Sequence, residues 1–204
     1  MAIVIEHYVA RWSASPFAGL TDPPWRITEQ AEALISAAIL ALDSEYRTID
    51  GVAVHRTATV EAGAIVKGPA IIGPNCFVAA SAYLRGGVFL DDDCIIGPGA
   101  ELKTSFMFAG SKLAHFNFVG DSILGSGVNL EAGSIIANYR NELEDKAIRI
   151  RLDGGVIETG VQKFGALLGD GVRIGANAVI APGAILAPGS RLARMALLDQ
   201  HPGA

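Results

Sequence analysis

Two cations and one histidine are the residues of this sequence whose types and spacing could do chemistry. Arg85 and Lys103 each follow an aliphatic residue directly, and they are 18 residues apart. If 18 residues carry the chain once around a repeating coil, the two cations stack at the inter-strand distance of about 4.8 Å. Unpaired like charges that close repel by about 1 kcal/mol even in water, and an anion between them reverses the sign. The pair therefore predicts a phosphate site, with two solvated surface residues as the alternative.

His115 is the candidate general base. It takes the same slot as the two cations, 12 residues beyond Lys103, which places it on another face of a regular coil. The register breaks just after it, because Ala114 and Phe118 are four residues apart instead of six. Such a break can lift a side chain out of the wall, and an imidazole that titrates near 6.5 accepts a proton at neutral pH. A structural histidine is the alternative.

The remaining reactive residue types predict no metal site. Cys76 and Cys94 offer neither a disulfide framework nor a paired metal-ligand spacing, so we expect free, buried thiols. A zinc site held by three histidines needs two of them close in sequence. The four histidines are instead scattered, one per region of the chain: His7, His55, His115 and His201.

The elements that must position these residues are six-residue repeats, each with an aliphatic residue followed four positions later by a small one. The first series of aliphatic positions is Val60, Val66, Ile72, Val78, Leu84, Leu90, Ile96 and Leu102, continued by Phe108 and Ala114. Later series run Phe118, Leu124, Leu130, Ile136 and Leu168, Ile174, Ile180, Leu186, Leu192. Helices favour spacings of three and four, and antiparallel sheets favour strict alternation. The pattern resembles an all-β, single-stranded left-handed parallel β-helix, in which three hexads make one triangular coil.

Two segments depart from the repeat. We expect residues 1–57 to be an N-terminal extension with one amphipathic helix, because TEQAEALISAAILALDSE has apolar residues at helical spacing. Residues 58–204 are expected to form the β-helix domain, with a hairpin inserted at about 140–162, where the sequence alternates around Asp153-Gly154-Gly155. An excursion from a solenoid usually lines a binding face. An inert decoration or a trimer contact is the alternative.

Composition narrows the class of protein. At 204 residues the chain predicts one domain. Its formal net charge of -5 argues against nucleic acid or anionic membrane as a partner. The first residues do not read as a secretory leader, and no uncharged apolar run reaches the length of a membrane span. We therefore expect a soluble, cytoplasmic protein.

A family resemblance is carried by the stretch from Arg85 to Tyr139. Its motifs are Glu101-x-Lys103, Gly110-Ser111-Lys112-x-Ala114-His115, Gly120-Asp121, Val128-Asn129, Ala132-Gly133 and Asn138-Tyr139. This stretch resembles the acetyltransferase domain of the bacterial bifunctional enzymes that acetylate glucosamine 1-phosphate and then uridylylate it. TGVQKFGALLGDGVRIG, after the insertion, is similar to the archaeal-type sugar-phosphate nucleotidylyltransferase/acetyltransferases. The likeness covers roughly residues 58–193. Residues 1–57 hold no nucleotidylyltransferase domain, so the resemblance implies acyl transfer alone.

The resemblance implies a role for each matching residue. His115 would be the general base, Glu101 would orient or polarise the apparatus, and the backbone N–H of Ala132 would face the oxyanion. The residues implied to bind the substrate are Arg85, Lys103 and Lys163 for the phosphate, Asn129, Asn138 and Tyr139 for the sugar, and Phe118. The acyl donor would be acetyl-CoA, near Ala176, Arg191 and Arg194. Family sites lie between subunits, so a homotrimer is implied as well.

The chain also departs from the family at several of these positions. Phe118 replaces a tyrosine that contacts the sugar phosphate, Ala176 replaces a serine near CoA, and Arg140-Asn141 replaces Asp-Gly. These changes leave the acceptor and the affinity for CoA open.

The function predicted from sequence is an acetyl-CoA-dependent N-acetyltransferase of an amino-sugar phosphate such as glucosamine 1-phosphate. One alternative is a non-catalytic binding module for a sugar phosphate or nucleotide sugar, or a trimeric scaffold. Another is transfer of a longer acyl chain, for which Phe106, Phe108 and Phe116 could line a groove, although core filling explains the same cluster.

Overall fold

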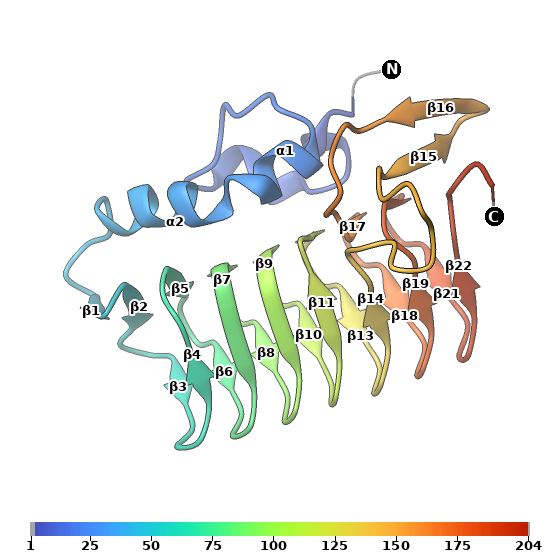
Figure 1. Cartoon of the computed structure of the whole chain (residues 1–204). Coiled ribbons are helices and arrows are strands. Elements are labelled where there is room, and N and C mark those ends of the chain that lie inside the picture. Colours follow the sequence, from blue (N-terminus) through green and yellow to red (C-terminus); the bar gives the residue numbers. More distant parts are fainter. Residues whose placement is uncertain (1–2, 204) are drawn as a thin grey trace.

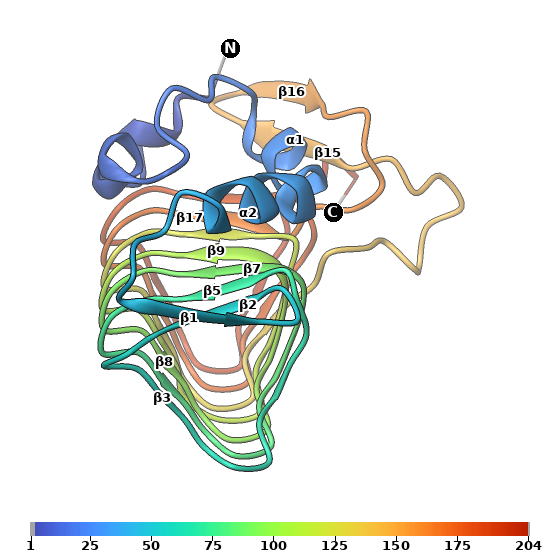
Figure 2. The same cartoon turned by 90° about the vertical axis from the view of Figure 1, so that its left-hand side faces the viewer.

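Short strands stacked in parallel make up most of the molecule (Figure 1). The computed structural model describes residues 3–203 and forms a β-solenoid of about eight turns, with few helices. Seen from its end, each coil is triangular, and helices and a hairpin cover one of its three sides (Figure 2). The predicted β-helix is therefore confirmed.

Each side of the prism is a stack of parallel strands, and we name the three sides the front, rear and covered faces. The front face holds β4 (Ile65–Val66), the first halves of β7 (Tyr83–Leu90) and β9 (Glu101–Met107), β11 (Phe118–Gly120), β14 (Ile135–Ile136), β19 (Val179–Ile180) and β22 (Leu197–Leu198). The rear face holds β3 (Thr59–Val60), β6 (Phe77–Val78), β8 (Ile95–Ile96), β10 (Lys112–Leu113), β13 (Asn129–Leu130), β18 (Arg173–Ile174) and β21 (Arg191–Leu192). The covered face holds β2 (Val52–His55), β5 (Ala70–Ile72), the second halves of β7 and β9, β12 (Ile123–Leu124), β17 (Ala166–Leu168) and β20 (Ala184–Leu186).

The repeat sequence folds this way because every coil adds aliphatic side chains to one continuous core. On the rear face the inward residues Val78, Ile96, Leu113, Leu130 and Ile174 are at most 1% exposed. Parallel neighbours satisfy one another's backbone groups from coil to coil. Parallel pairing already begins where β2 meets β5, upstream of residue 58.

The coil length is not constant, which corrects the predicted register. Leu90 pairs with Met107, Ile96 with Leu113 and Leu102 with Val119, so these coils are one residue shorter than 18. The inward residues are therefore Met107, Leu113 and Val119 instead of Phe108, Ala114 and Phe118.

The shortening has a local cause at the corner between the front and covered faces. β7 turns this corner with Gly86 and Gly87, whereas β9 turns it with Thr104 alone (φ 50°). In the next coil Asp121 (φ 46°) does the same between β11 and β12. A single left-handed residue thus replaces two, and every later position moves by one.

A second hydrophobic cluster lies outside the prism, over the covered face. It is built from the N-terminal segment, with 3-10 turns at Ile5–His7 and Ala10–Ala14 and helices α1 (Pro24–Glu29) and α2 (Ala31–Ile39), and from the hairpin β15 (Arg149–Leu152) and β16 (Gly155–Glu158). A further antiparallel strand, β1 (Tyr46–Ile49), pairs with β2. Trp12 packs on Phe106 and Phe108. The N-terminal segment therefore contains two short helices where the sequence predicts one.

Candidate active site

Arg85 and Lys103 are register partners on β7 and β9, at the spacing that the sequence analysis used. Each cation, however, has its own carboxylate. Arg85 Nη2 lies 2.6 Å from Glu101 Oε1, and Lys103 Nζ lies 2.8 Å from Asp121 Oδ2. The expectation of two uncompensated charges is therefore wrong, because for each cation the next coil supplies an acid beside it. Glu101 holds Arg85.

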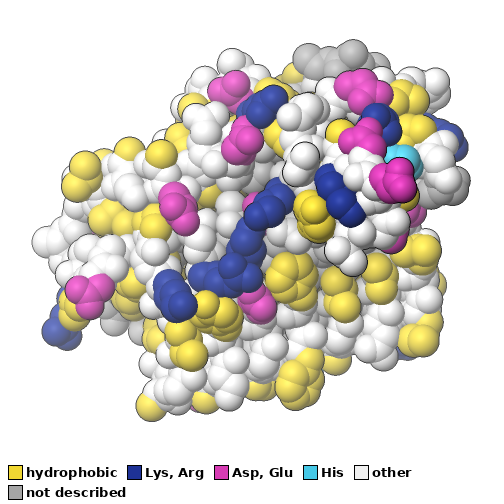
Figure 3. Space-filling view, in the orientation of Figure 1, with side chains coloured by type: hydrophobic (Ala, Val, Ile, Leu, Met, Phe, Trp, Pro, Cys, Tyr) yellow, Lys and Arg dark blue, Asp and Glu magenta, His cyan; other side chains and the backbone are white. Residues whose placement is uncertain are grey.

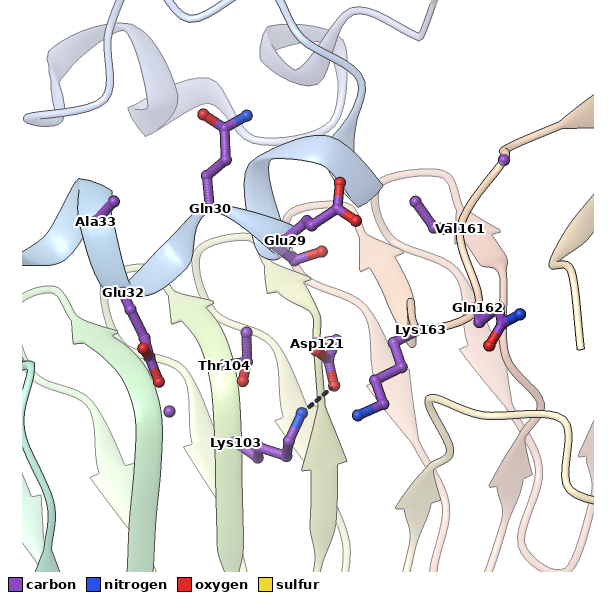
Figure 4. Close-up of a pocket in the computed structure, with 13 residues that line it drawn as sticks. Glu29, Gln30, Glu32, Ala33, Lys103, Thr104, Asp121, Val161, Gln162 and Lys163 are labelled. Carbon is purple, nitrogen blue, oxygen red and sulfur yellow. Dashed lines mark hydrogen bonds and ion pairs between the residues drawn. The ribbon is translucent and has the colours of Figure 1, made fainter.

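Lys67, Arg85 and Lys103 form a band of positive side chains on the front face, which we call the cation row (Figure 3). The row reaches a cavity of about 750 Å³ where the front face meets the helices. Lys163, on the chain returning from the hairpin, points into this cavity beside Lys103 and Asp121 (Figure 4). Lys163 has no ion-pair partner within residues 3–203. Two amino groups thus converge at one cavity.

Asn138 and Tyr139 differ in how closely they approach this cavity. The amide of Asn138 donates a hydrogen bond to Asp121 Oδ2, the oxygen that also holds Lys103. Tyr139 is 37% exposed, and the ammonium of Lys146 lies 5.6 Å from its ring centroid. Asn138 therefore positions the lysine's counter-ion, whereas the Tyr139 ring faces solvent and Lys146.

His115 lies at the corner that joins the rear and front faces, in the turn between β10 and β11. The repeat pattern predicted that His115 directly follows an inward residue, but the inward residue is Leu113, so His115 comes two positions later. Its side chain is exposed, and its imidazole has no hydrogen-bond partner in the described chain. Phe116 follows it with φ 52° and is 73% exposed. A left-handed backbone costs a non-glycine residue roughly 1 kcal/mol.

This corner continues upward through Ala132, Ala176 and Arg194, one residue per coil. The register of the flanking strands sets Ala132 directly above His115, and Gly133 N–H donates to the His115 carbonyl. Coils are about 4.8 Å apart. The structure therefore stacks the three residues that the family resemblance joined as base, oxyanion donor and cofactor contact.

The backbone N–H of Ala132 is free for a reason found in the coil below. In two other coils the equivalent N–H donates to a glutamate: Ala80 to Glu61 Oε2 at 2.8 Å and Ala176 to Glu131 Oε2 at 2.9 Å. The residue in that position below Ala132 is Ala114, which has no acceptor. Within the described residues no group accepts from Ala132 N–H. An oxyanion could therefore use it.

Three further predicted residues lie at or beside the rear face. Asn129, Arg191 and Arg194 line a groove of about 620 Å³. Arg194 pairs with Glu131, which also binds Ala176 N–H. The pKa of Glu131 is lowered, first by the hydrogen bond from Arg194 and then by that from Ala176 N–H. The Ala176 N–H is therefore already occupied.

Sequence reasoning missed Arg173, which lines the same groove and is the register partner of Arg191. Both guanidiniums are exposed, and neither has an ion-pair partner in the part of the chain that the structure describes. The uncompensated cation pair is thus on the rear face. The sequence contained a signal for this pair, the same 18-residue spacing that singled out Arg85 and Lys103, because Arg173 and Arg191 are 18 residues apart in equivalent slots.

The aromatic residues do not form a groove. Phe106 and Phe108 are fully buried under the N-terminal segment, whereas Phe116 is exposed at the His115 corner. Phe118 lies on the front face in register with Glu101. Packing against Trp12 explains the two buried rings.

Residues 3–203 contain neither a candidate metal site nor a candidate membrane-spanning helix. No three His, Cys, Asp or Glu side chains come together as metal ligands there, and no helix of that range has the length and apolar character needed to cross a bilayer. Cys76 and Cys94 are free and buried.

The repeats of this chain match those of known proteins. Residues 69–102 and 165–193 match the model of the hexapeptide repeat of succinyl-transferase. A bifunctional sugar-1-phosphate nucleotidylyltransferase/acetyltransferase of Sulfurisphaera tokodaii is 33% identical over 152 residues, which are 74% of this chain and 37% of that protein. The bifunctional protein GlmU of Methanococcus vannielii is 33% identical over 51% of this chain and 27% of its own length. The chain thus contains hexapeptide repeats and is similar to these bifunctional proteins over part of their length.

This hexapeptide-repeat protein spans about a third of the length of the Sulfurisphaera relative, 37%. Among solved structures, a hexapeptide transferase family protein from Anaplasma phagocytophilum matches with a TM-score of 0.46 and 17% identity, over 70% of this chain and 73% of that one. The sequence matches to the repeat model and to the two bifunctional proteins confirm the predicted family resemblance.

Proposed function

We propose that the protein is an acetyl-CoA-dependent N-acetyltransferase acting on an amino-sugar phosphate such as glucosamine 1-phosphate. One observation carries the proposal: an exposed, unpartnered imidazole stands one coil below a backbone N–H that no side chain occupies. The Sulfurisphaera relative is named a bifunctional sugar-1-phosphate nucleotidylyltransferase/acetyltransferase, which supports this reaction class. The reaction forms an amide from the sugar amine and the acetyl thioester and releases the CoA thiol.

The side chains divide the work along the front face. Arg85, Lys103 and Lys163 hold the phosphate. The sugar ring lies over the next row toward the corner, that of Glu101 and Phe118, so its amine reaches His115. His115 accepts the proton that the nitrogen loses on attack and returns it to the departing thiolate. Ala132 N–H donates to the oxygen of the tetrahedral intermediate, where preorganised donors matter most.

The rear face suits the phosphates of the acyl donor. Arg173 and Arg191 stack without counter-ions, so an anion between them removes their repulsion. They lie beside the corner that leads from His115 through Ala132 and Ala176 to Arg194. A donor that carries several phosphates and a long arm can therefore be anchored there with its thioester at His115.

A homotrimer with shared sites accompanies this proposal. Asn129 is on the rear face and Phe118 on the front face of the same chain, so one ligand meets both only if a second copy packs against the corner. The outward residues of the front face above Phe118 are apolar, namely Ile135, Val179 and Leu197. Apolar, little-charged faces suit such packing.

Release of free thiol from acetyl-CoA, with glucosamine 1-phosphate and a panel of amino sugars and their phosphates, tests the proposal. We expect turnover with a phosphorylated amino sugar, and its loss by at least a hundredfold in His115→Ala with an unchanged melting temperature, because the side chain is exposed. No thiol release with any acceptor contradicts the proposal.

A binding protein without catalysis is the second candidate. The observation that favours it is the Glu131 carboxylate, which occupies Ala176 N–H and Arg194 on the corner. Calorimetric binding of the sugar phosphate without thiol release would establish it.

A further inference from the structure

The cavity beside Lys103 has a roof that the repeat does not supply. Glu29, Gln30, Glu32 and Ala33, from α1, α2 and the turn between them, line it above the front face (Figure 4). The solenoid contributes Lys103, Thr104 and Asp121, and the return from the hairpin contributes Lys163. The cations of the cavity thus come from below and beside it, and the helices add only acids and neutral groups.

Glu32 is the roof acid that lacks a counter-ion. Glu29 lies 2.6 Å from Arg26, which offsets its charge. Glu32 is exposed to the cavity and has no ion-pair partner within residues 3–203. Asp121, the third acid of the cavity, is already paired with Lys103.

The backbone of Glu32 is fixed by the strand beneath it. A Cβ on Gly87 would lie 2.8 Å from Glu32 N, so α2 begins in direct contact with the two-glycine corner of β7. Gly87 has φ 87°, a conformation that glycine adopts without strain. The carboxylate therefore projects from a pinned backbone, and Figure 4 shows its side chain directed down toward the strands.

The order of groups along the front face says what meets this carboxylate. His115 is at the rear corner, the row of Glu101 and Phe118 comes next, then the cation row, and the roof lies beyond it. If the sugar amine is at His115 and its phosphate is on the cation row, any group attached to the far side of that phosphate enters the cavity under Glu32.

We propose that Glu32 is a specificity-determining residue that selects an acceptor with a single phosphate and rejects one with a diphosphate, such as a nucleotide sugar. This inference rests on the proposed function in placing the sugar amine at His115 and the phosphate on the cation row. Lys163, which also reaches this cavity, is engaged by the first phosphate, so a second phosphate would meet the uncompensated Glu32 carboxylate in a partly enclosed cavity. Two like charges about 4 Å apart repel by about 1 kcal/mol in water and by more in a partly enclosed cavity, and about 1.4 kcal/mol changes affinity tenfold.

Glu32→Gln tests the proposal because it removes the charge and keeps the size and helix propensity of the side chain. Calorimetry measures the Kd of glucosamine 1-phosphate and of uridine-diphosphate glucosamine for the full chain. The wild type should bind the monophosphate at least tenfold more tightly. In Glu32→Gln the Kd of the diphosphate should fall about tenfold, and that of the monophosphate should change less than threefold.

Glu6→Gln is the matched control, since Glu6 is also an exposed glutamate of the N-terminal segment but lies outside the cavity. It should leave both Kd values unchanged. A rise from 0.05 to about 0.5 M salt should shrink the discrimination of the wild type, because screening weakens a repulsion between charges.

The outcomes separate this proposal from the enzymatic one. Equal wild-type affinity for the two ligands, or a Glu32→Gln variant that keeps the wild-type ratio, overturns the role of Glu32 whether or not acetyl transfer occurs. Selective binding that Glu32→Gln abolishes, without thiol release, supports the role of Glu32 and removes the enzymatic proposal. Absence of binding by both ligands overturns the role of Glu32, and thiol release with the panel of acceptors then decides the enzymatic proposal separately.

Discussion

Ala114 leaves the backbone N–H of Ala132 without an acceptor among the described residues. Glu61 and Glu131 occupy the equivalent position in other coils, and each accepts the hydrogen bond of the N–H above it. A methyl group in that position leaves Ala132 N–H open to a ligand. Ala114 is therefore important because it has no carboxylate that could accept the hydrogen bond of Ala132 N–H.

Ala114→Glu should therefore inactivate the protein by satisfying Ala132 N–H internally. Loss of one oxyanion donor costs about a hundredfold or more in kcat. The melting temperature should change little, because the chain already accommodates glutamate in this slot at two other coils. Thiol release and a thermal melt measure the two effects.

Glu61→Ala is the converse control for that substitution. It frees the N–H of Ala80, which lies two coils below His115, about 10 Å away, and so out of reach of the reacting carbonyl; thiol release should equal that of the wild type. Full activity in Ala114→Glu would show that Ala132 N–H is not the donor.

Arg140 is a single residue with a structural role. It is 2% exposed and donates to both oxygens of Asp199, at 2.7 and 2.6 Å, and to the Pro182 carbonyl. The hydrogen bonds from Arg140 are the first cause that lowers the pKa of Asp199. The residue that departs from the family pattern thus ties the start of the excursion to the last coil.

Arg140→Gln should lower the free energy of unfolding by about 3 kcal/mol at pH 7, because it breaks a buried ion pair. A lowered folded-state pKa gives stability that is complete above the unfolded-state value, about 3.9 for Asp, and is lost as pH falls through the folded-state value. The deficit of the variant should therefore shrink below about pH 4. Urea unfolding from pH 7 to 3 measures it, and a constant deficit contradicts the assignment.

At the scale of elements, the two-glycine corner of β7 positions the roof. Gly87→Ala would force a left-handed alanine and bring its Cβ to 2.8 Å from Glu32 N. Gly110, with φ 71°, has open space at its Cβ, so Gly110→Ala isolates the backbone cost of about 1 kcal/mol.

We expect Gly87→Ala to destabilise the protein by at least 1 kcal/mol more than Gly110→Ala does, because α2 must shift. Chemical unfolding followed by tryptophan fluorescence measures both variants, since Trp12 and Trp25 lie in the cluster that the helices form. Equal losses would show that the contact with α2 carries no strain.

The strand stack could be predicted from sequence because its cause is local. Aliphatic residues every six positions give parallel coils, and the 18-residue spacing placed Arg85 beside Lys103. The shortened coils could not be seen, because the single left-handed residue at position 104 is a threonine, which carries no turn signal of its own. His115 was consequently assigned to a strand slot instead of a corner.

The roof could not be predicted because it depends on tertiary packing. Helical spacing indicated α2, but nothing in it places Glu32 against Gly87, 55 positions later. Arg173 could have been found, because it repeats the spacing that singled out Arg85 and Lys103. Long-range docking is the part of the site that periodicity leaves open.

At the scale of the whole molecule, complementation tests the shared site. Lys103→Met removes a front-face cation, and the double variant Arg173→Ala/Arg191→Ala removes the rear-face pair. Each should lower thiol release at least tenfold. If each site combines the front face of one copy with the rear face of another, mixed trimers contain some intact sites, so refolding both variants together should restore part of the activity.

Sedimentation of the wild type should show three copies per particle, and mixing without refolding should restore less activity. A refolded mixture no more active than its components would show that front and rear faces of different copies do not share a site.

The excursion between β14 and β17 leaves the register intact, since Ile123, Leu124 and Ile136 pair with Leu167, Leu168 and Ile180 as though nothing intervened. The register of the solenoid is therefore independent of the hairpin, although Ile148 and Ile150 pack the hairpin into the second hydrophobic cluster. A segment of another length or sequence could therefore replace the hairpin at this point and present new side chains over the covered face, without a change in the register of the strands.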